Sequence, residues 1–172
     1  MKSLTMQIWI VLFFVCMLFA GCITEIEESE KYKSIVINEL LPMNNESGAD
    51  QSGQYDDWIE LYNLSDTDVD LSGCYLTDSQ NDLTKWKFPD GTIIAKNGFL
   101  IVWADGDTNA AGLHASYKLS ADGETVVLVT PEQNIIDKVK YPATTTEQSY
   151  ARIPNGTGDF IWTKPTFSKS NE

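Results

Sequence analysis

The chain has little of the chemistry that most metal sites and nucleophilic enzymes use. Its 172 residues include a single histidine, His114, and three cysteines. Zinc needs several imidazole or thiolate ligands, so a zinc site is not expected. His114 lies near Ser116 and Ser120, but no Gly-x-Ser-x-Gly elbow is present. The sequence therefore favours a histidine that packs or bonds within a loop over a catalytic triad.

Basic residues are also scarce. Lys and Arg number 12 against 25 Asp and Glu, and the formal net charge is −13. Polyphosphate backbones select proteins that offer cations. No glycine-rich loop precedes a helix-forming stretch, so a phosphate cradle is missing too. Nucleic acid is therefore not an expected partner, whereas cations would be tolerated.

Long apolar runs are absent except at the N-terminus. Lys2 is followed by an apolar run from Ile8 to Ala20 and then by Gly21-Cys22, the pattern of a secretory signal. The run is shorter than the roughly 20 residues of a membrane span. Leu18-Phe19-Ala20-Gly21-Cys22 is similar to a lipoprotein signal box, in which the cysteine is acylated and becomes the new N-terminus.

The sequence therefore predicts three parts: a lipoprotein signal peptide over 1–21, a charged tether over 22–33 that starts at lipidated Cys22, and a domain over 34–172. An ordinary secreted protein and an uncleaved anchor are the alternatives. With acylation the protein would be held at the cell membrane or cell envelope, on the extracytoplasmic side. Cys74 would be the one cysteine left in the domain, where apolar neighbours predict a small core residue.

No stretch after residue 33 keeps a 3.6-residue apolar period for three turns. Short β-branched and alternating runs recur instead, separated by turn signals such as Pro89-Asp90-Gly91 and Asn97-Gly98. The runs are 34–41, 57–63, 69–71, 74–77, 86–88, 92–94, 99–103, 125–129, 135–141 and 149–152, the last an edge candidate. Many short strands at this spacing indicate an all-β sandwich or barrel.

Five ordered segments of the chain resemble the lamin tail domain, an immunoglobulin-like β-sandwich, and are closest to its secreted prokaryotic branch. The segments are IVINELLP (35–42), DDWIELYNLSDTDVDLSGCYLTD (56–78), KFPDGTIIAKNGFLIVWAD (87–105), LHASYKLSADGETVVLVTPEQNIIDKVKY (113–141) and SYARIPNGTGDFIWTKPTFSKSN (149–171). The resemblance implies an interaction or anchoring module without catalytic residues. The nuclear members have been linked to DNA, but this exported, acidic chain departs from them, so nucleic-acid binding is not carried over.

Glu39 and Glu60 are the first candidates for catalytic chemistry. Each lies on a separate predicted strand, and glycosidases use two carboxyl groups about 5 to 10 Å apart across a cleft. A sandwich offers no deep cleft at this place. We therefore expect each glutamate to pair with a cation, for which Lys85, Lys87, Lys138 and Arg152 are available.

Acidic loops raise the possibility of calcium. Asp105, Asp107 and Asn109 place oxygen ligands at alternate positions around Gly106, and calcium takes six to eight oxygens. Turn formation is the competing explanation, because Asp and Asn stabilise turns through their side chains. The three residues are the first candidates for a calcium site, and no other cofactor is expected.

The stretch DDWIELYN (56–63) alternates between two faces. Ile59 and Leu61 should face the core between the sheets, while Trp58, Glu60 and Tyr62 share the other face. That second face is either a binding surface or is covered by another segment. We favour cover, because the loops 42–55 and 104–116 must lie somewhere on the domain.

The sequence thus predicts a lipid-anchored, non-catalytic module with an unknown protein or glycan partner. A calcium-dependent carbohydrate-binding or adhesion module is the alternative.

Overall fold

The computed structural model describes residues 30–172, of which Ser34–Glu172 form one compact unit. The predicted signal peptide (1–21), the lipidated Cys22 and most of the predicted tether (22–33) lie outside the described residues. In the part of the chain that is described, no helix is both long and apolar enough to cross a membrane.

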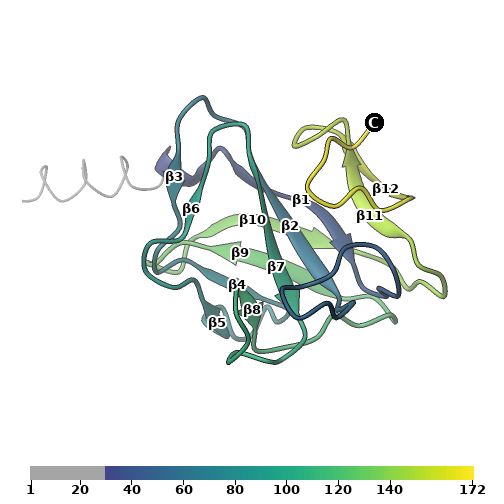
Figure 1. Ribbon diagram of the computed structural model, residues 1–172. Coiled ribbons are helices and arrows are strands. Elements are labelled where there is room, and N and C mark those ends of the chain that lie inside the picture. Colours follow the sequence, from purple (N-terminus) through teal and green to yellow (C-terminus); the bar gives the residue numbers. More distant parts are fainter. Residues whose placement is uncertain (1–29) are drawn as a thin grey trace, which may run out of the picture. The chain divides into compact units, whose positions relative to one another are not determined.

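Twelve β-strands and their connecting loops build the unit (Figure 1). The strands are β1 (Ile35–Leu41), β2 (Trp58–Asn63), β3 (Val69–Asp70), β4 (Tyr75–Thr77), β5 (Trp86–Lys87), β6 (Ile93–Ile94), β7 (Phe99–Ala104), β8 (His114–Ala115), β9 (Thr125–Val129), β10 (Ile135–Lys140), β11 (Ser149–Ile153) and β12 (Asp159–Thr163).

The strands form two main sheets packed as an immunoglobulin-like sandwich, as the sequence predicts. The larger sheet has the order β12-β11-β1-β2-β7-β8, and the smaller has the order β10-β9-β4-β5. β3 and β6 pair separately as a two-stranded ribbon. All pairings are antiparallel except β7 with β8. In Figure 1, β1, β2 and β7 cross over the strands of the smaller sheet.

The core between the sheets comes from the apolar alternation of the strands. Ile59 and Leu61 are completely buried, as predicted, and stand opposite Leu40 and Ile37 of β1. Cys74 is completely buried as well, which confirms its prediction as a core residue. Buried Val126–Val129 supply the matching strand of the smaller sheet.

The predicted strands are all present, but the last one is not an edge. β11 (Ser149–Ile153) lies between β1 and β12 in the larger sheet. The sequence predicted no strand over 159–163, where Gly156 and Gly158 indicate a loop just before it. Those glycines instead form the turn of a β11–β12 hairpin, in which Gly158 donates its N–H to the Pro154 carbonyl at 2.9 Å.

Candidate functional site

A bulge in β1 gathers three polar side chains on the outer face of the larger sheet. The register of β1 with β2 shifts between Ile37 and Glu39, so Asn38 has no partner residue and Glu39 stands opposite Glu60. A bulge breaks the strict alternation of a strand and places successive side chains on similar sides. All three side chains, those of Asn38, Glu39 and Glu60, are completely buried, so this face is covered. Their polar atoms therefore need hydrogen-bond partners from within the protein.

The partners of Glu60 are neutral. One carboxylate oxygen accepts a hydrogen bond from the Asn38 side-chain amide at 3.0 Å, and the other accepts one from the Ser168 backbone N–H at 2.7 Å. The prediction of a cationic partner was therefore wrong. Amide donors satisfy a buried carboxylate without requiring a long cationic side chain to be desolvated beside it.

Glu39 is bonded by the same C-terminal segment. One of its carboxylate oxygens accepts the Thr166 backbone N–H at 3.0 Å, and the other accepts the Thr166 hydroxyl. The backbone of 164–171 thus presents donors to both glutamates, and the two carboxylates lie beneath it side by side.

Three asparagines fix the position of this segment. Buried Asn171 donates from its side-chain amide to the carbonyls of Asn38 and Arg152, and its side-chain oxygen lies 2.7 Å from the Thr166 hydroxyl oxygen. The Asn155 side-chain oxygen accepts from the Asn171 N–H at 2.8 Å. The end of the chain is therefore bonded to β1, to β11 and to the hairpin turn.

Phe167 covers the apolar part of the outer face of the larger sheet, where Trp58 and Trp103 lie. Its ring packs edge-on to Trp58, with centroids 5.5 Å apart, and lies 5.7 Å from the ring of Trp103. Gly48 makes room for it: a Cβ atom there would lie 2.4 Å from the Phe167 ring, and its φ of 79° also favours glycine. The Trp58 indole N–H donates to the Ser47 carbonyl at 2.9 Å.

The proposed binding face of Trp58, Glu60 and Tyr62 is therefore corrected to a covered one. Trp58 and Glu60 have no exposed surface, and Tyr62 is half-buried against Phe99. The sequence predicted that this face is covered, with the loops 42–55 and 104–116 as the covering segments. The first loop contributes through Ser47 and Gly48, but the main cover is 164–171.

Burial shifts the acid–base behaviour of this cluster. Loss of solvation raises the pKa of Glu60 to about 7, and the nearby negative charge of Glu39 adds to the rise. Loss of solvation also raises the pKa of Glu39, against hydrogen bonds that lower it. Two neighbouring carboxyl groups with raised pKa values are a feature of many acid–base sites, but here 164–171 covers both groups and donates hydrogen bonds to them.

The predicted calcium candidates are engaged in their own loop. One Asp105 oxygen lies 2.7 Å from Nδ1 of His114, and the other accepts the Asp107 N–H at 2.9 Å. Asp107 in turn accepts the Asn109 N–H at 3.1 Å. Within residues 30–172 no group of three or more His, Cys, Asp or Glu side chains is arranged to hold a metal ion.

His114 is a loop-bonding residue, as the sequence favoured. Its second ring nitrogen lies 3.1 Å from the Ala111 carbonyl. Burial lowers the pKa of His114, but the hydrogen bonds to Asp105 and Ala111 outweigh burial and the net shift is upward. Neither of the two nearby serines forms a hydrogen bond with His114. Ser116 donates its hydroxyl to the Lys85 carbonyl at 3.1 Å, and Ser120 belongs to the cluster described next.

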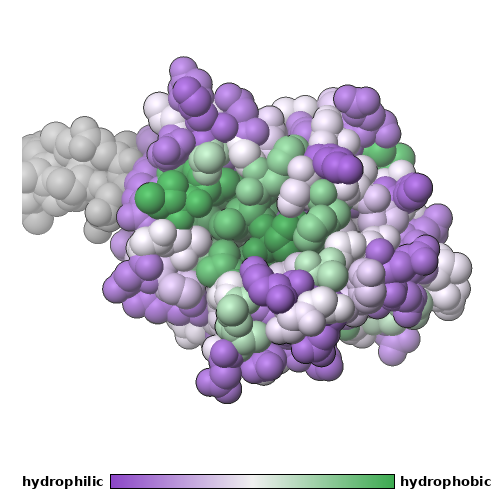
Figure 2. Space-filling model, viewed as in Figure 1, coloured by the Kyte–Doolittle hydropathy of each residue, from purple (hydrophilic) through white to green (hydrophobic). Residues whose placement is uncertain are grey.

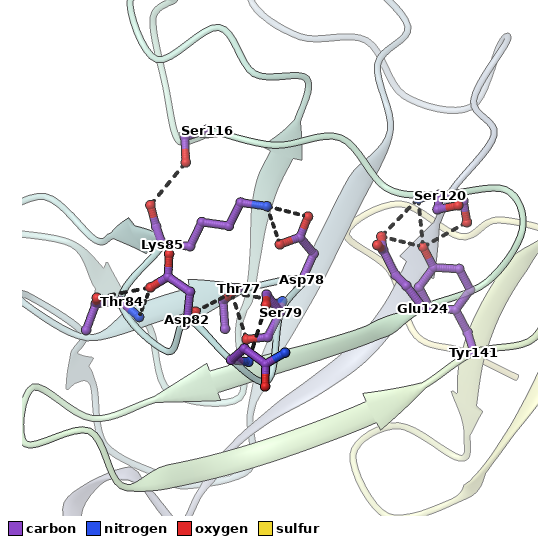
Figure 3. Close-up of polar contacts among 11 residues, drawn as sticks. Thr77, Asp78, Ser79, Asp82, Thr84, Lys85, Ser116, Ser120, Glu124 and Tyr141 are labelled. Atoms are coloured by element: carbon purple, nitrogen blue, oxygen red, sulfur yellow. Dashed lines mark hydrogen bonds and ion pairs between the residues drawn. The ribbon is translucent and has the colours of Figure 1, made fainter.

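The remaining polar clusters also hold loops to strands (Figure 3). Lys85 donates to both Asp78 oxygens, at 2.6 and 2.8 Å. On the other side of that view, the Ser120 N–H and the Tyr141 hydroxyl both donate to Glu124, at 2.9 and 2.8 Å. Lys85 therefore pairs with a loop aspartate, and Arg152, another predicted partner of the buried glutamates, pairs with Asp137 at 3.2 Å.

The sequence placed 149–171 in the fifth family-like segment but did not predict that 164–171 covers the outer face. Phe167 is the one large apolar residue of that stretch and has no periodic neighbours to mark it. The available signal was the position of Glu39 and Glu60 within largely apolar strands, since a buried carboxylate needs hydrogen-bond donors.

The model of the Lamin Tail Domain family matches residues 28–143. The match takes in β1 to β10 and ends before β11, β12 and the covering segment. No curated protein matches the chain in sequence.

Proposed function

The chain belongs to the lamin tail domain family, and from this premise we propose that it is a membrane-anchored, extracytoplasmic lipoprotein whose domain is a non-catalytic interaction and attachment module. The family is one of immunoglobulin-like structural and interaction domains. In this proposal Cys22 carries the lipid, 22–33 is the tether and the sandwich meets a protein or glycan of the cell envelope.

An apolar area on the surface carries this proposal. Seen from the side of Figure 1, a broad apolar area lies around β6 and β7, and hydrophilic side chains surround it (Figure 2). Ile93 of β6 is 56% exposed, the highest fraction among the exposed large apolar side chains. Apolar areas with a polar rim are typical of surfaces that meet a partner.

The internal bonding of the reactive side chains supports the non-catalytic part. Glu39 and Glu60 are buried and bonded to 164–171, and His114 is bonded to Asp105. A catalytic group needs to reach a substrate. These groups instead form hydrogen bonds that fix loops and the C-terminal segment to the sheets, as a rigid binding scaffold requires.

Fractionation tests the anchor. With Cys22 acylated, Cys22→Ala should move the protein from the membrane fraction to the soluble or secreted fraction. Cys16→Ala, a cysteine change in the same N-terminal region, is the matched control and should leave the protein in the membrane fraction. Membrane association of the Cys22→Ala protein would refute the lipid anchor.

Quantitative capture tests the interaction surface. Envelope extracts passed over the immobilised chain should lose one defined component, and Ile93→Lys should reduce its retention at least tenfold. Ile135→Lys is the matched control, because Ile135 is 54% exposed on β10, in the smaller sheet. Equal retention by the Ile93→Lys and unchanged chains would contradict the assignment of this surface.

A further inference from the structure

The edges of the two large sheets differ in how well they resist pairing with another chain. β5 and β8 are two residues long. β10 has a break in its register between Ile135 and Asp137 and carries exposed Lys138 and Lys140. Short, irregular and charged edges are features that prevent edge-to-edge association. Three of the four edges are thus protected.

The fourth edge, β12, lacks most of these features, and its one charged residue, Asp159, lies at the start of the strand. Its five residues pair with β11 without a break in register, and it contains no lysine or arginine. Ile161 at its centre is 49% exposed. An unbroken, apolar edge strand is a ready template for another strand. The β11–β12 hairpin lies outside the range of the family match.

The hydrogen bonds of the hairpin show which backbone groups of β12 point outward. Gly158 donates its N–H to the Pro154 carbonyl, so it occupies a bonded position opposite β11. Bonded and non-bonded positions alternate in antiparallel pairs. Asp159, Ile161 and Thr163 therefore direct their N–H and C=O groups away from β11, toward the open edge of the sheet.

We propose that two copies of this chain pair through β12, antiparallel, with Ile161 on the two-fold axis. This register places Ile161 opposite Ile161 of the second copy and Asp159 opposite Thr163. All three outward-facing residues of each strand then occupy bonded positions, and six N–H···O=C hydrogen bonds form. The pairing requires that the backbone N–H and C=O groups of the central residue point away from β11, and those of Ile161 do.

The side chains complement this register. Phe160 faces Trp162 of the second copy on the side of the sheet where Tyr150 stacks with Phe160 and packs against Trp162, each with ring centroids 5.1 Å apart. The aromatic row thus continues across the axis.

The charge of the whole molecule makes the pairing depend on salt. Two chains that each carry a net charge of −13 repel each other at low ionic strength. Screening weakens this repulsion over distances of about 10 Å at 0.1 M salt, whereas backbone hydrogen bonds at the axis are little affected. Dimerisation should therefore strengthen as salt is added, the reverse of what binding to a cationic peptide would show.

Mass measurement tests the proposal directly. The full chain in non-ionic detergent should show a monomer–dimer equilibrium by light scattering coupled to chromatography. Ile161→Lys places two cations on the axis and should raise the dimer dissociation constant at least tenfold. Ile135→Lys makes the same change on the β10 edge and should leave the constant unchanged. A monomer at every concentration, or equal weakening by the two variants, would overturn the proposal.

Disulfide cross-linking tests the register. Residues facing each other in a bonded antiparallel pair have Cα atoms about 5.5 Å apart, within the range that a disulfide spans. Ile161→Cys should therefore yield a covalent dimer on its own. Asp159→Cys and Thr163→Cys should yield one only when the two variants are mixed. Cross-linking of Asp159→Cys alone as efficiently as Ile161→Cys would refute the two-fold axis at Ile161.

Discussion

Glu60 shows how little the identity of a residue says about its role. An acidic residue between Trp58 and Tyr62 suggests a binding or catalytic site, and its strand position suggests a cationic partner. The structure gives it two neutral donors, the Asn38 amide and the Ser168 N–H, and no exposed surface. The Glu60 carboxylate binds the C-terminal segment through the Ser168 N–H, and burial raises the pKa of Glu60 to about 7.

The raised pKa of Glu60 predicts how stability depends on pH. The folded protein holds the Glu60 proton up to about pH 7, whereas the unfolded chain releases it near pH 4.5. The folded state therefore binds more protons between these values, and the free energy of unfolding should fall as pH rises from 4.5 to 7. Glu60→Gln should remove up to about 3 kcal/mol of this fall.

Urea unfolding at pH 5 and pH 8 measures this effect. Part of the fall should remain in the Glu60→Gln variant, because Glu39 and Asp57 also have raised pKa values from burial. Glu132→Gln is the control, since Glu132 is exposed, and should behave as the unchanged chain does. An identical pH dependence in Glu60→Gln would show that Glu60 is ionised throughout.

Phe167 carries a second prediction at the residue scale. Phe167→Ala removes the ring that packs against Trp58 and Trp103. Complete burial would make this change cost 3–5 kcal/mol, and since Phe167 is half-buried we expect about 2 kcal/mol. Denaturant unfolding measures the loss, and tryptophan emission should shift to longer wavelength as water reaches Trp58. Phe167→Leu should recover most of the stability.

At the scale of elements, the covering segment behaves as part of the sandwich although it has no regular structure. Thr166 and Ser168 supply backbone donors to two strands, and Asn171 bonds to carbonyls of β1 and β11. Buried carboxylates left without donors would be costly. The strands and the segment therefore depend on each other, and the segment should open only at a substantial cost in free energy.

Asn171→Ala tests this dependence. The substitution leaves the buried carbonyls of Asn38 and Arg152 without their donor, which should lower the free energy of unfolding by about 1–3 kcal/mol. Hydrogen exchange should also accelerate at the Ser168 N–H, because the segment is released locally. Lys169→Ala changes an exposed neighbour and should have neither effect. Similar exchange rates in the two variants would contradict this role for Asn171.

At the scale of the whole molecule, charge predominates. A net charge of −13 on 172 residues repels itself within the folded chain. Screening should therefore stabilise the fold, by about 1 kcal/mol between 20 and 500 mM salt. This general effect has to be separated from specific binding of calcium at Asp105, Asp107 and Asn109.

A comparison of two divalent salts makes that separation. Since both Asp105 oxygens are bonded within the loop, calcium chloride and magnesium chloride at equal ionic strength should raise the Tm by the same amount. Thermal unfolding followed by circular dichroism measures both shifts. A Tm several degrees higher in calcium, abolished by Asp107→Asn, would establish a calcium site at this loop.

The sequence by itself determined most of the strands, the sandwich and the core, although it did not predict β8 and β12. Alternation places Ile59 and Leu61 in the core whatever lies beyond the strand, and turn residues end each strand locally. These are short-range effects, which a sequence pattern records. The environment of Cys74 followed in the same way, and so did the choice of a loop-bonding His114 over a triad.

Only the tertiary structure decided what covers the outer face and where the sheet ends. Ser168 reaches Glu60 across 108 positions of sequence, and Thr166 reaches Glu39 across 127. No local pattern encodes such a contact, because the donors are backbone N–H groups that every residue but proline has. For the same reason β12 looked like a loop: its strand character comes from pairing with β11, and its open edge is visible only in the assembled sheet.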